Sequence, residues 1–412
     1  MLIEFSVENF KSIKNKATLS MVAGKVSENT ENVIKDKNLL KTAVMYGANA
    51  AGKTTIIQAF TATILLIRNS NSRAITDPLP LIVPFKFDEE TLTSPSKFEF
   101  TFITNNIKYI YGFSADNKKI YEEYLYQYLS AKPSMVFERN NTDEYHFVQS
   151  EDSKLKEIAE KNTPNKLFLA TATNWNYDRT RDAYIWFEKQ IDTYDNFLVA
   201  TPNTMEKFEN DINDELKDFT INLFKKTDIS ITDYVCEVKE INLPPHVAFA
   251  LNNNIMPKEN IKSKEINFFM AHTINNSNYT LNLHEESLGT QTLFLLSPVL
   301  KSAFDEGRII VVDEIDKSLH PLLVEALIKL FHDKEINKNN AQLIFNTHNT
   351  NLLDLDIFRR DQIWFVEKNN DTQDTILYSL DEFSVRKNEN IEKGYLLGKF
   401  GGIPFVDEGG IL

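Results

Sequence analysis

A glycine-rich stretch near the start of the chain constrains its fold more than any other feature. Residues 47–55, GANAAGKTT, match the pattern G-x-x-x-x-G-K-[ST]. The short apolar run at 42–46 before it is typical of a strand, and the apolar residues within 55–68 recur as they do in a helix. A strand, a glycine loop and a helix N-terminus in this order direct backbone N–H groups toward an anion, and the helix dipole favours negative charge there. The stretch therefore predicts an α/β unit that binds the phosphates of a nucleotide.

The residues of this loop predict how it would hold the phosphates. Gly47 and Gly52 allow backbone angles and a close approach that a Cβ atom would block. Lys53 would reach the β- and γ-phosphates, and the hydroxyl of Thr54 would bind Mg²⁺. The structural alternative, a glycine turn before an ordinary helix, requires neither the lysine nor the hydroxyl.

Length and composition are those of a globular protein. The 412 residues are enough for two or three domain-sized units, and 42% hydrophobic with 25% charged residues is the balance of a soluble chain. No apolar run approaches the roughly 20 residues that cross a bilayer, and the N-terminus lacks the features of a secretory signal. The single cysteine, Cys236, cannot form an intrachain disulfide. We therefore expect a cytoplasmic protein that does not contact a membrane.

The net charge of −14 limits the kinds of partner. Indiscriminate coating of nucleic acid depends on neutralising phosphates, and an acidic chain is poorly suited to that task. A local basic groove is not excluded, so direct contact with nucleic acid is left open. An acidic chain also suits a basic partner surface.

Strand patterns dominate the first part of the chain. Residues 2–8 alternate as a strand does and turn through 9–12, after which the P-loop unit follows. An aromatic-rich antiparallel meander comes next, with strands expected at 97–102, 107–113, 120–129, 135–139 and 145–148. We predict that residues 1–150 form an N-terminal lobe with the P-loop and the meander.

Helical periodicity replaces strand alternation after residue 150. Apolar residues recur at steps of three and four in one stripe, which we interpret as core: Met205, Phe208, Ile212, Leu216, Phe219 and Leu223. This pattern predicts a helical insertion over 151–228, and it is far too short for a sustained coiled-coil arm.

Residues 229–412 return to mixed patterns and form the predicted C-terminal lobe. Strand patterns at 229–241 and 265–283 flank a loop rich in Asn and Lys at 252–264. Helix, buried strand, helix and buried strand are then expected, at 290–304, 309–312, 321–331 and 342–345. The chain as a whole predicts an α/β fold with a mixed, largely parallel P-loop sheet, an antiparallel β meander and a helical insertion.

Candidate catalytic residues follow the buried strands of this lobe. Asp313 and Glu314 come directly after 309–312, and ligands of a parallel sheet bind at the carboxyl ends of its strands. We expect Asp313 to support Mg²⁺ and Glu314 to polarise the attacking water. Asp316 follows this pair, and His348 follows the last buried strand, from which it could hydrogen-bond a phosphate or the water.

A second candidate phosphate site lies at the start of the helix that precedes Asp313. Ser287 can cap that helix, Gly289 lets backbone approach a phosphate, and Gln291 lies in the same turn. Helix capping alone would explain the serine. Its position 26 residues before Asp313 leaves room for one helix and one strand, which favours a functional segment.

Together these motifs resemble an ABC-type ATPase head of the SMC/RecF/OLD group of AAA family ATPases. The resemblance rests on GANAAGKTT at 47–55, ESLGTQ at 286–291, VVDEID at 311–316, FNTHNT at 345–350 and the opening FSVENFKS at 5–12. It covers about 1–70 and 265–412 strongly and the middle only in outline. SLHP at 318–321 and GYLLGKFGGIP at 394–404 are most similar to the RloA/AbiL-type ATPases of bacterial anti-phage defence.

The resemblance implies a role for each matching residue. Phosphates and Mg²⁺ would be bound by Gly47, Asn49, Ala50, Gly52, Lys53, Thr54 and Thr55, with Lys11 and Ser12 near the nucleotide. Asp313 would support Mg²⁺, Glu314 would be the general base, Asp316 would belong to the D-loop and His348 would be the switch histidine. Ser287, Gly289 and Gln291 would belong to the signature.

The same resemblance implies a cofactor and an assembly. In ABC ATPases the signature of one subunit completes the site of another, so ATP with Mg²⁺ implies a head-to-head homodimer or a larger even-numbered oligomer. Leu288 replaces the first glycine of the LSGGQ pattern, and Pro298 should kink the signature helix. The Q-loop glutamine is not assigned by spacing.

These features predict an ATPase whose ATP-driven dimerisation regulates a separate effector in anti-phage defence. The chain ends 64 residues after His348, so we expect no fused nuclease domain. In RloA/AbiL-type systems the neighbour is a separate, Toprim-like protein. A phage-derived trigger would act on the ATPase, and the helical insertion is the expected contact for a trigger or partner.

Three other functions fit parts of the sequence. A DNA-repair or chromosome-maintenance ATPase would bind DNA through an SMC/RecF-like head, although this chain lacks the coiled-coil arm. A transporter's nucleotide-binding subunit carries its P-loop and acidic pair much closer together than the 260 residues found here. A scaffold without hydrolysis remains open, although every catalytic residue type is present.

Overall fold

The computed structural model describes residues 1–26, 28–148, 152–195, 202–242, 262–317, 319–386 and 389–403. The chain forms two compact units. The first comprises Met1–Asn196, Ala303–Lys317 and Leu327–Leu412, and the second comprises Phe197–Ser302 and Ser318–Ala326. The range predicted as a helical insertion, 151–228, is therefore shared between the units, and the three-part domain division stays a prediction.

A seven-stranded antiparallel sheet contains the N-terminal strand and the meander. Its strand order is β10-β9-β8-β7-β6-β1-β2. The strands are β1 (Leu2–Glu8), β2 (Ala17–Ser20), β6 (Ser96–Thr104), β7 (Ile107–Ala115), β8 (Ile120–Tyr128), β9 (Ser134–Asn140) and β10 (Glu144–Phe147). The five predicted meander strands are confirmed, because polar turns separate aromatic-rich runs. A small ribbon of β3 (Val33–Ile34) and β4 (Leu39–Leu40) lies outside this sheet.

A six-stranded sheet carries the P-loop. Its order is β11-β15-β16-β5-β17-β18, parallel except for the antiparallel edge strand β18. The strands are β5 (Thr42–Gly47), β11 (Ile191–Tyr194), β15 (Ile309–Val312), β16 (Gln342–Asn346), β17 (Ile363–Lys368) and β18 (Thr375–Ser379). The aliphatic runs of β15 and β16 are fully buried, as expected for strands covered on both faces. This sheet and the meander confirm the predicted fold class.

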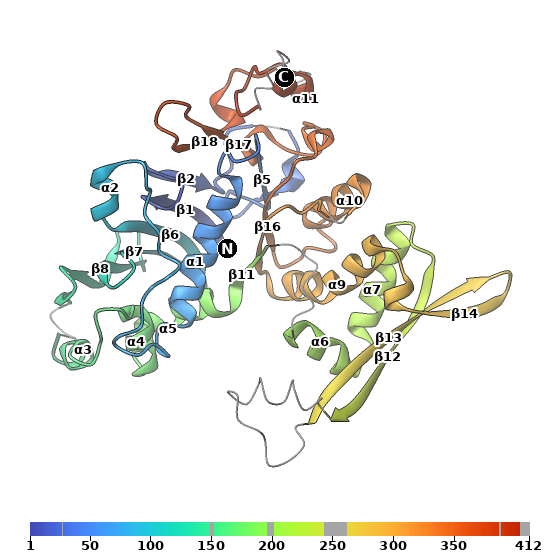
Figure 1. The fold of residues 1–412 in the computed structure, drawn as a ribbon, viewed down its shortest axis with the longest axis horizontal. Coiled ribbons are helices and arrows are strands. Elements are labelled where there is room, and N and C mark those ends of the chain that lie inside the picture. The colour runs from blue at the N-terminus through green and yellow to red at the C-terminus, as the bar shows by residue number, and fades with distance from the viewer. Residues whose placement is uncertain are drawn as a thin grey trace, which may run out of the picture. The chain divides into compact units, whose positions relative to one another are not determined.

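Helix α1 (Lys53–Arg68) packs between these two sheets (Figure 1). Phe60 contacts Phe5 of β1 and Phe100 of β6, with ring centroids 3.9 and 5.8 Å apart. The helix also contacts β5, β15 and β16. It begins two residues earlier than predicted, so Lys53 and Thr54 belong to its first turn.

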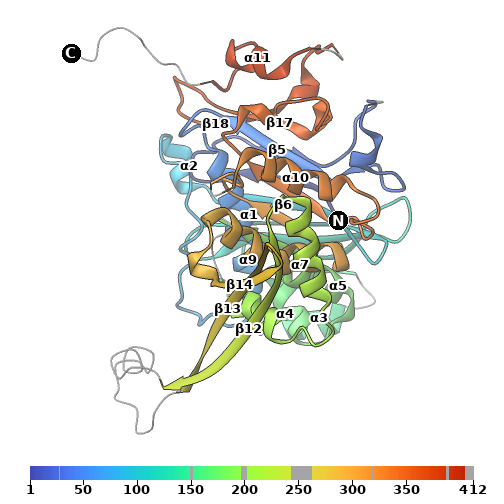
Figure 2. The same ribbon diagram turned by 90° about the vertical axis from the view of Figure 1, so that its right-hand side faces the viewer.

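Short helices complete the first unit. They are α2 (Glu89–Thr93), α3 (Asp152–Ala159), α4 (Phe168–Asn174), α5 (Asp178–Ile185), which continues as a π-helical turn at Trp186–Gln190, and α11 (Ile391–Leu396). Figure 2 shows α11 at the top of the view, beyond β17 and β18. Its Tyr395 stacks on Phe365 of β17, with ring centroids 5.4 Å apart.

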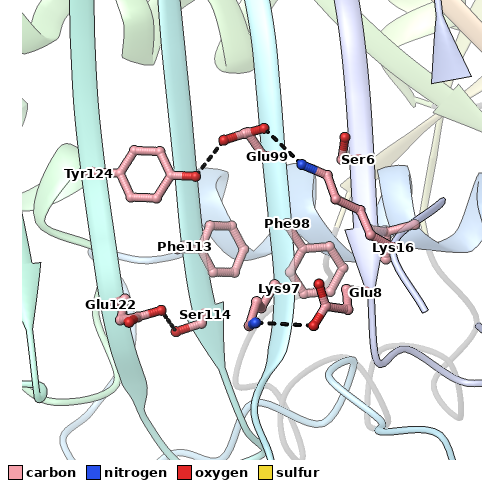
Figure 3. A pocket seen from close by; sticks show the side chains of 11 residues that line it. Ser6, Glu8, Lys16, Lys97, Phe98, Glu99, Phe113, Ser114, Glu122 and Tyr124 are labelled. Carbon is pink, nitrogen blue, oxygen red and sulfur yellow. Dashed lines mark hydrogen bonds and ion pairs between the residues drawn. The ribbon is translucent and has the colours of Figure 1, made fainter. Parts of the chain in front are cut away.

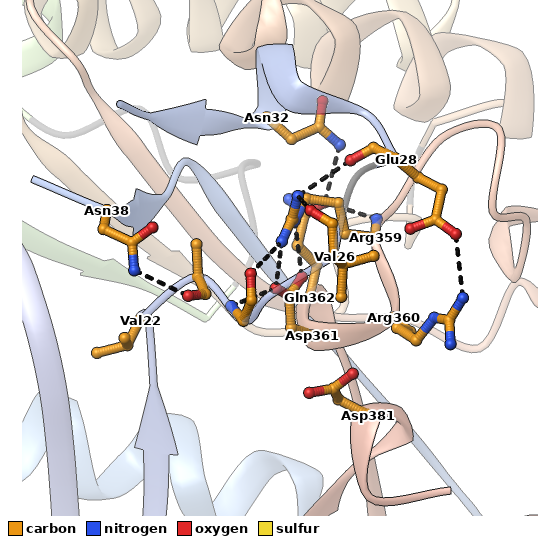
Figure 4. A network of polar contacts seen from close by, with 12 residues as sticks. Val22, Val26, Glu28, Asn32, Asn38, Arg359, Arg360, Asp361, Gln362 and Asp381 are labelled. Carbon is orange, nitrogen blue, oxygen red and sulfur yellow. Dashed lines mark hydrogen bonds and ion pairs between the residues drawn. The ribbon is translucent and has the colours of Figure 1, made fainter. Parts of the chain in front are cut away.

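A buried arginine ties the N-terminal segment to the start of β17 (Figure 4). The guanidinium of Arg359 donates to the backbone carbonyls of Gly24, Val26 and Glu28, each at 3.0 Å. It also pairs with Asp361 at 2.7 Å, and Asp361 in turn accepts from the Gly24 N–H at 2.7 Å. One side chain thus donates hydrogen bonds to three backbone carbonyls of the N-terminal segment.

The second unit is built around Phe294. Its helices are α6 (Pro202–Glu209) and α7 (Glu215–Lys226), and its sheet is β12 (Ile231–Asn242), β13 (Lys262–Ile274) and β14 (Ser277–Asn282) in that order. Helices α9 (Leu288–Glu306) and α10 (Pro321–His332) contribute residues to both units. Four rings surround Phe294 with centroid distances between 4.5 and 6.4 Å: Phe208, Phe224, Tyr234 and Phe268.

Two sequence-based expectations differ from the structure in this part of the chain. The apolar stripe from Met205 to Leu223 is divided between α6 and α7, and Ile212 in the connecting turn is 91% exposed. The spacing of the apolar residues continues through the turn between α6 and α7. Because the spacing alone does not reveal a turn of the backbone, it predicted one continuous stripe. The loop expected at 252–264 lies outside the described residues up to 261, and Lys262 begins β13. None of the helices in the described ranges has the length and hydropathy needed to cross a membrane.

Candidate functional site

The P-loop connects β5 to α1 in a tightly packed turn. Gly52 has φ +113°, and a Cβ atom there would lie 2.1 Å from the hydroxyl oxygen of Thr375. A Cβ atom on Gly47 would lie 2.2 Å from the carbonyl oxygen of Val366. Both positions therefore require glycine, one for its backbone angle and both for space. Ala50 also has positive φ, at 62°, and is exposed with Asn49 at the tip of the loop.

Lys53 lies under this loop. Its side chain is only 6% exposed, and its ammonium donates to the carbonyl oxygens of Gly47 at 2.6 Å and Ala48 at 3.1 Å. Burial lowers the pKa of Lys53, and the nearby charges of Asp313 and Glu314 oppose that shift. The lysine thus places a positive charge directly against the backbone of the loop.

Three neighbouring parallel strands bring the predicted catalytic residues to one edge of the sheet. Asp313 follows β15, and its Oδ1 accepts a hydrogen bond from the hydroxyl of Thr54 at 3.1 Å. The amide of Asn346, the last residue of β16, also donates to Asp313. Burial raises the pKa of Asp313, and the hydrogen bonds from Asn346 and Thr54 partly offset this. A hydroxyl and a carboxylate in contact are oxygen ligands of the kind that Mg²⁺ uses with substrate phosphates.

Glu314 occupies a strained backbone position beside this pair. Its φ is +51°, which is uncommon for a residue with a side chain, and its N–H donates to Asn346 Oδ1 at 2.5 Å. The carboxylate is 37% exposed, with Lys317 Nζ 3.4 Å from one oxygen and His348 Nε2 4.0 Å from the other. The carboxylate thus lies near Lys317 and His348 at the carboxyl end of β15.

Asp316 and His348 are linked through the backbone. The His348 N–H donates to Asp316 Oδ2 at 3.3 Å, and the imidazole is exposed. A pocket of about 330 Å³ lies between this loop and the P-loop, lined by Tyr46, Gly47, Asn49, His348 and Tyr395 among others. Asp316 thus holds the backbone of the loop that carries the histidine.

The turn at Lys11 and Ser12 reaches the first turn of α1. Lys11 has φ +50°, and its ammonium donates to Gln58 Oε1 at 2.7 Å. Ser12 Oγ donates to Thr55 Oγ1 at 2.9 Å. Burial lowers the pKa of Lys11, and the charge of Asp195 opposes that shift. Both residues therefore lie beside the P-loop helix, and their predicted place near the nucleotide stays a prediction.

The predicted signature residues belong to the second unit. Ser287 Oγ accepts the Thr290 N–H at 3.2 Å, which is the hydrogen bond of a helix cap. Gln291 Nε2 donates to the Glu286 carbonyl at 2.8 Å. Gly289 lies in the first turn of α9, which continues past Pro298 to Glu306. The three predicted signature residues thus lie at the start of this helix, where Ser287 is exposed and the other two are half-buried.

The structure adds residues that sequence reasoning missed. Asn346 contacts both Asp313 and the Glu314 backbone, and its place at the end of a predicted buried strand could have identified it. Asp195 follows β11, a four-residue strand that the surrounding helical pattern concealed, and its charge contributes to the raised pKa of Asp313. Thr375 begins β18, a strand with no motif to indicate it.

Another pocket lies on the antiparallel sheet, over β1, β6, β7 and β8 (Figure 3). Four of its charged side chains form two ion pairs: Lys97 lies 3.0 Å from Glu8, and Lys16 lies 3.4 Å from Glu99. Tyr124 donates to Glu99 at 2.6 Å. At about 120 Å³ this pocket is smaller than the roughly 300 Å³ of a small-ligand site. Its residues are not those of the predicted site.

Comparisons with known proteins show which family this chain belongs to. One similar solved structure is "Crystal structure of the SmcHead bound to the C-winged helix domain of ScpA", with 13% identity, 92% of this chain and 98% of that chain covered, and a TM-score of 0.42. Another is "Crystal structure of the Smc head domain with a coiled coil and joint derived from Pyrococcus yayanosii", with 10% identity, coverage of 92% and 99%, and a TM-score of 0.42. No curated protein matches the chain. Residues 43–354 match the family described as "AAA domain, putative AbiEii toxin, Type IV TA system", and the chain belongs to this family of AAA-type ATPase domains.

Proposed function

We propose that this protein hydrolyses ATP as an ABC-type ATPase. The observation that carries the proposal is the contact between Thr54 and Asp313, 259 residues apart in the chain, beside the buried ammonium of Lys53. A P-loop hydroxyl and a carboxylate at the end of another buried strand of the same sheet, β15, are the parts that phosphoryl-transfer ATPases use to hold Mg²⁺. Membership of an AAA family supports the same activity.

Each residue of the site has a role in this proposal. Thr54 and Asp313 would hold Mg²⁺, which neutralises developing charge on the phosphates when it is bound. Lys53 and the P-loop N–H groups would bind the phosphates, with Asn49, Ala50 and Thr55. Glu314 would take the proton of the attacking water, and His348 would stabilise that carboxylate and the water.

The proposal includes an ATP-dependent dimer. Ser287, Gly289 and Gln291 lie at an exposed helix start, where N–H groups and a dipole favour an anion. In the proposed dimer, each copy presents this segment to the nucleotide of the other. ATP binds the closed pair more tightly than the open one, so binding closes the dimer and hydrolysis opens it.

We further propose that the ATPase regulates a separate effector in anti-phage defence, as in the RloA/AbiL-type systems. The family description names an AbiEii toxin and a type IV toxin–antitoxin system. Those words concern the family, and their relevance here rests on the motifs SLHP and GYLLGKFGGIP in this chain. The proposed effector is a Toprim-like nuclease, and the proposed trigger comes from the phage.

The first experiment compares wild type with Glu314→Gln. Removing the base should reduce ATP turnover by at least about a hundredfold, the usual contribution of a positioned base, while ATP-Mg²⁺ still binds. Light scattering should then record a dimer, or a larger even-numbered assembly, for Glu314→Gln with ATP-Mg²⁺ and a smaller species without it.

A matched control separates the base from its surroundings. Lys317→Gln removes the neighbouring surface charge and should retain most of the turnover, because Lys317 is not one of the proposed catalytic groups. Wild-type turnover that is absent, or unaffected by Glu314→Gln, would contradict hydrolysis at this site. A mass that does not depend on ATP would contradict the dimer.

A further inference from the structure

The strand β18 meets the P-loop at one threonine. Thr375 is 3% exposed, and its N–H donates to the Ser12 carbonyl at 2.8 Å. Its hydroxyl lies 2.8 Å from two acceptors, Ser12 Oγ and the backbone carbonyl of Ala51 in the P-loop. The missing Cβ of Gly52 provides the space that this hydroxyl occupies. An edge strand far along the chain is therefore hydrogen-bonded directly to the phosphate-binding loop.

Ser12 extends this contact to the first turn of α1. Ser12 Oγ donates to Thr55 Oγ1 at 2.9 Å, so Thr375, Ser12 and Thr55 form a row of three hydroxyls. The row begins at a fully buried residue and ends at Thr55, which is partly exposed at the helix N-terminus. Residues from three distant parts of the chain thus meet at one phosphate-binding position.

Proton counting gives the row a direction. Each hydroxyl carries one proton, so Thr375 donates at any moment to Ser12 or to Ala51, but not to both. When Thr375 donates to Ser12 and Ser12 donates to Thr55, the proton of Thr55 is left for an outside acceptor. When Thr375 donates to Ala51, its oxygen can instead accept the proton of Ser12, which then no longer donates to Thr55.

We propose that Thr375 is a positioning residue for nucleotide binding, which acts through Ser12 to direct the hydroxyl of Thr55 toward a phosphate oxygen. The inference rests on the proposed function, because it requires a nucleotide at the P-loop. A role in stability alone would need only the hydrogen bond from Thr375 to the Ala51 carbonyl. The second contact, to a hydroxyl that itself contacts the helix N-terminus, connects Thr375 to the ligand.

The test compares Thr375→Ala with Thr375→Ser, which differ only in the hydroxyl. The affinity for a non-hydrolysable ATP analogue with Mg²⁺ is measured by calorimetry, and thermal unfolding is measured without nucleotide. We expect Thr375→Ala to weaken binding about fivefold, the effect of one hydrogen bond worth about 1 kcal/mol, and Thr375→Ser to bind like wild type. In turnover assays KM should rise more than kcat falls.

A double-mutant cycle tests the route through Ser12. In a Ser12→Ala background the row is already interrupted, so Thr375→Ala should cause little further loss of affinity. Additive effects of the two substitutions would overturn the proposal. If Thr375→Ala does not fold, Ser12→Ala and Thr375→Ser still give the comparison, since only the former should weaken binding.

Thr63 provides the matched control for a buried hydroxyl. Thr63 lies on α1, the helix that also carries Thr55. It is fully buried, and its hydroxyl donates to the Ala59 carbonyl at 2.7 Å. Thr63→Ala should lower thermal stability without changing nucleotide affinity. Equal affinity of wild type and Thr375→Ala, or a loss that serine does not restore, would overturn the inference. Failure of the wild type itself to bind the analogue would instead contradict the proposed function.

Discussion

His332 is a buried histidine at the end of α10, near the amino end of β5. It is 7% exposed, its Nε2 lies 2.9 Å from Thr42 Oγ1, and its backbone carbonyl accepts from Lys41 Nζ at 3.1 Å. Burial, with a smaller contribution from the charge of Lys41, lowers the pKa of His332 to about 3. In an unfolded chain a histidine titrates near about 6.5. At a pH between about 3 and about 6.5, the unfolded chain therefore binds a proton at His332 that the folded protein does not bind, and this favours unfolding.

The stability of the first unit should accordingly decrease as the pH falls from about 6.5 toward 3, by up to about 1.4 kcal/mol per pH unit from this one proton. His332→Asn keeps a polar side chain without the titration and should flatten the slope. The measurement is the urea midpoint between pH 7.5 and 5. His284→Asn, at an exposed position, is the control. Identical slopes for wild type and His332→Asn would refute this account.

At the scale of elements, a buried carboxylate joins the meander to helix α4. Glu123 of β8 accepts the N–H groups of Phe168 at 2.6 Å and Leu169 at 2.9 Å, and it accepts the Tyr111 hydroxyl at 3.0 Å. Arg139 Nη1 lies 3.7 Å away and is equally buried. Burial raises the pKa of Glu123, while the charge of Arg139 and these hydrogen bonds act in the opposite direction.

Removing this carboxylate should destabilise the protein strongly. Glu123→Ala leaves the donors of α4 unpaired and Arg139 without its countercharge, which costs about 3–5 kcal/mol for a broken buried pair. Chemical unfolding of Glu123→Ala and Glu122→Ala provides the comparison. Glu122 is exposed on the same strand and bonds Ser114, so its loss should stay within about 0.5 kcal/mol. Similar losses of unfolding free energy for both variants would contradict the role of Glu123 in binding the N-terminal N–H groups of α4.

Several elements were predictable because their signals are local. The meander strands carry polar turns between aromatic runs, and β15 and β16 are continuous aliphatic segments. Strand β11 was not predictable, because four residues between helices contain too little periodicity. The prediction of a core stripe through Ile212 was wrong for the opposite reason. The apolar periodicity is present there, but the backbone turns and Ile212 is exposed.

For the whole molecule, the proposed composite site makes a prediction about mixtures. Ser287→Arg should abolish turnover by blocking the signature, and Lys53→Ala should abolish it by removing the phosphate-binding lysine. Mixing the two variants forms heterodimers in which one site has both an intact P-loop and an intact signature. Turnover of the mixture should rise above that of either variant, toward roughly a quarter of wild type for randomly paired, independent sites.

The measurement is ATP turnover of the two variants alone and mixed in equal amounts. A mixture as inactive as its components would mean that the signature does not act on a partner's nucleotide. Full activity of Ser287→Arg alone would remove the signature from the mechanism.

The sequence by itself determined the local pieces of this site. The P-loop, the acidic pair after β15 and the histidine after β16 each depend on residues within one turn or strand, so short motifs indicate them. Only the tertiary structure decided which pieces meet. The order β15-β16-β5 brings Asp313 to Thr54, and the edge strand β18 brings Thr375 to Ser12. Strand pairing depends on packing between residues hundreds of positions apart, and such contacts leave no periodic signal in a single sequence.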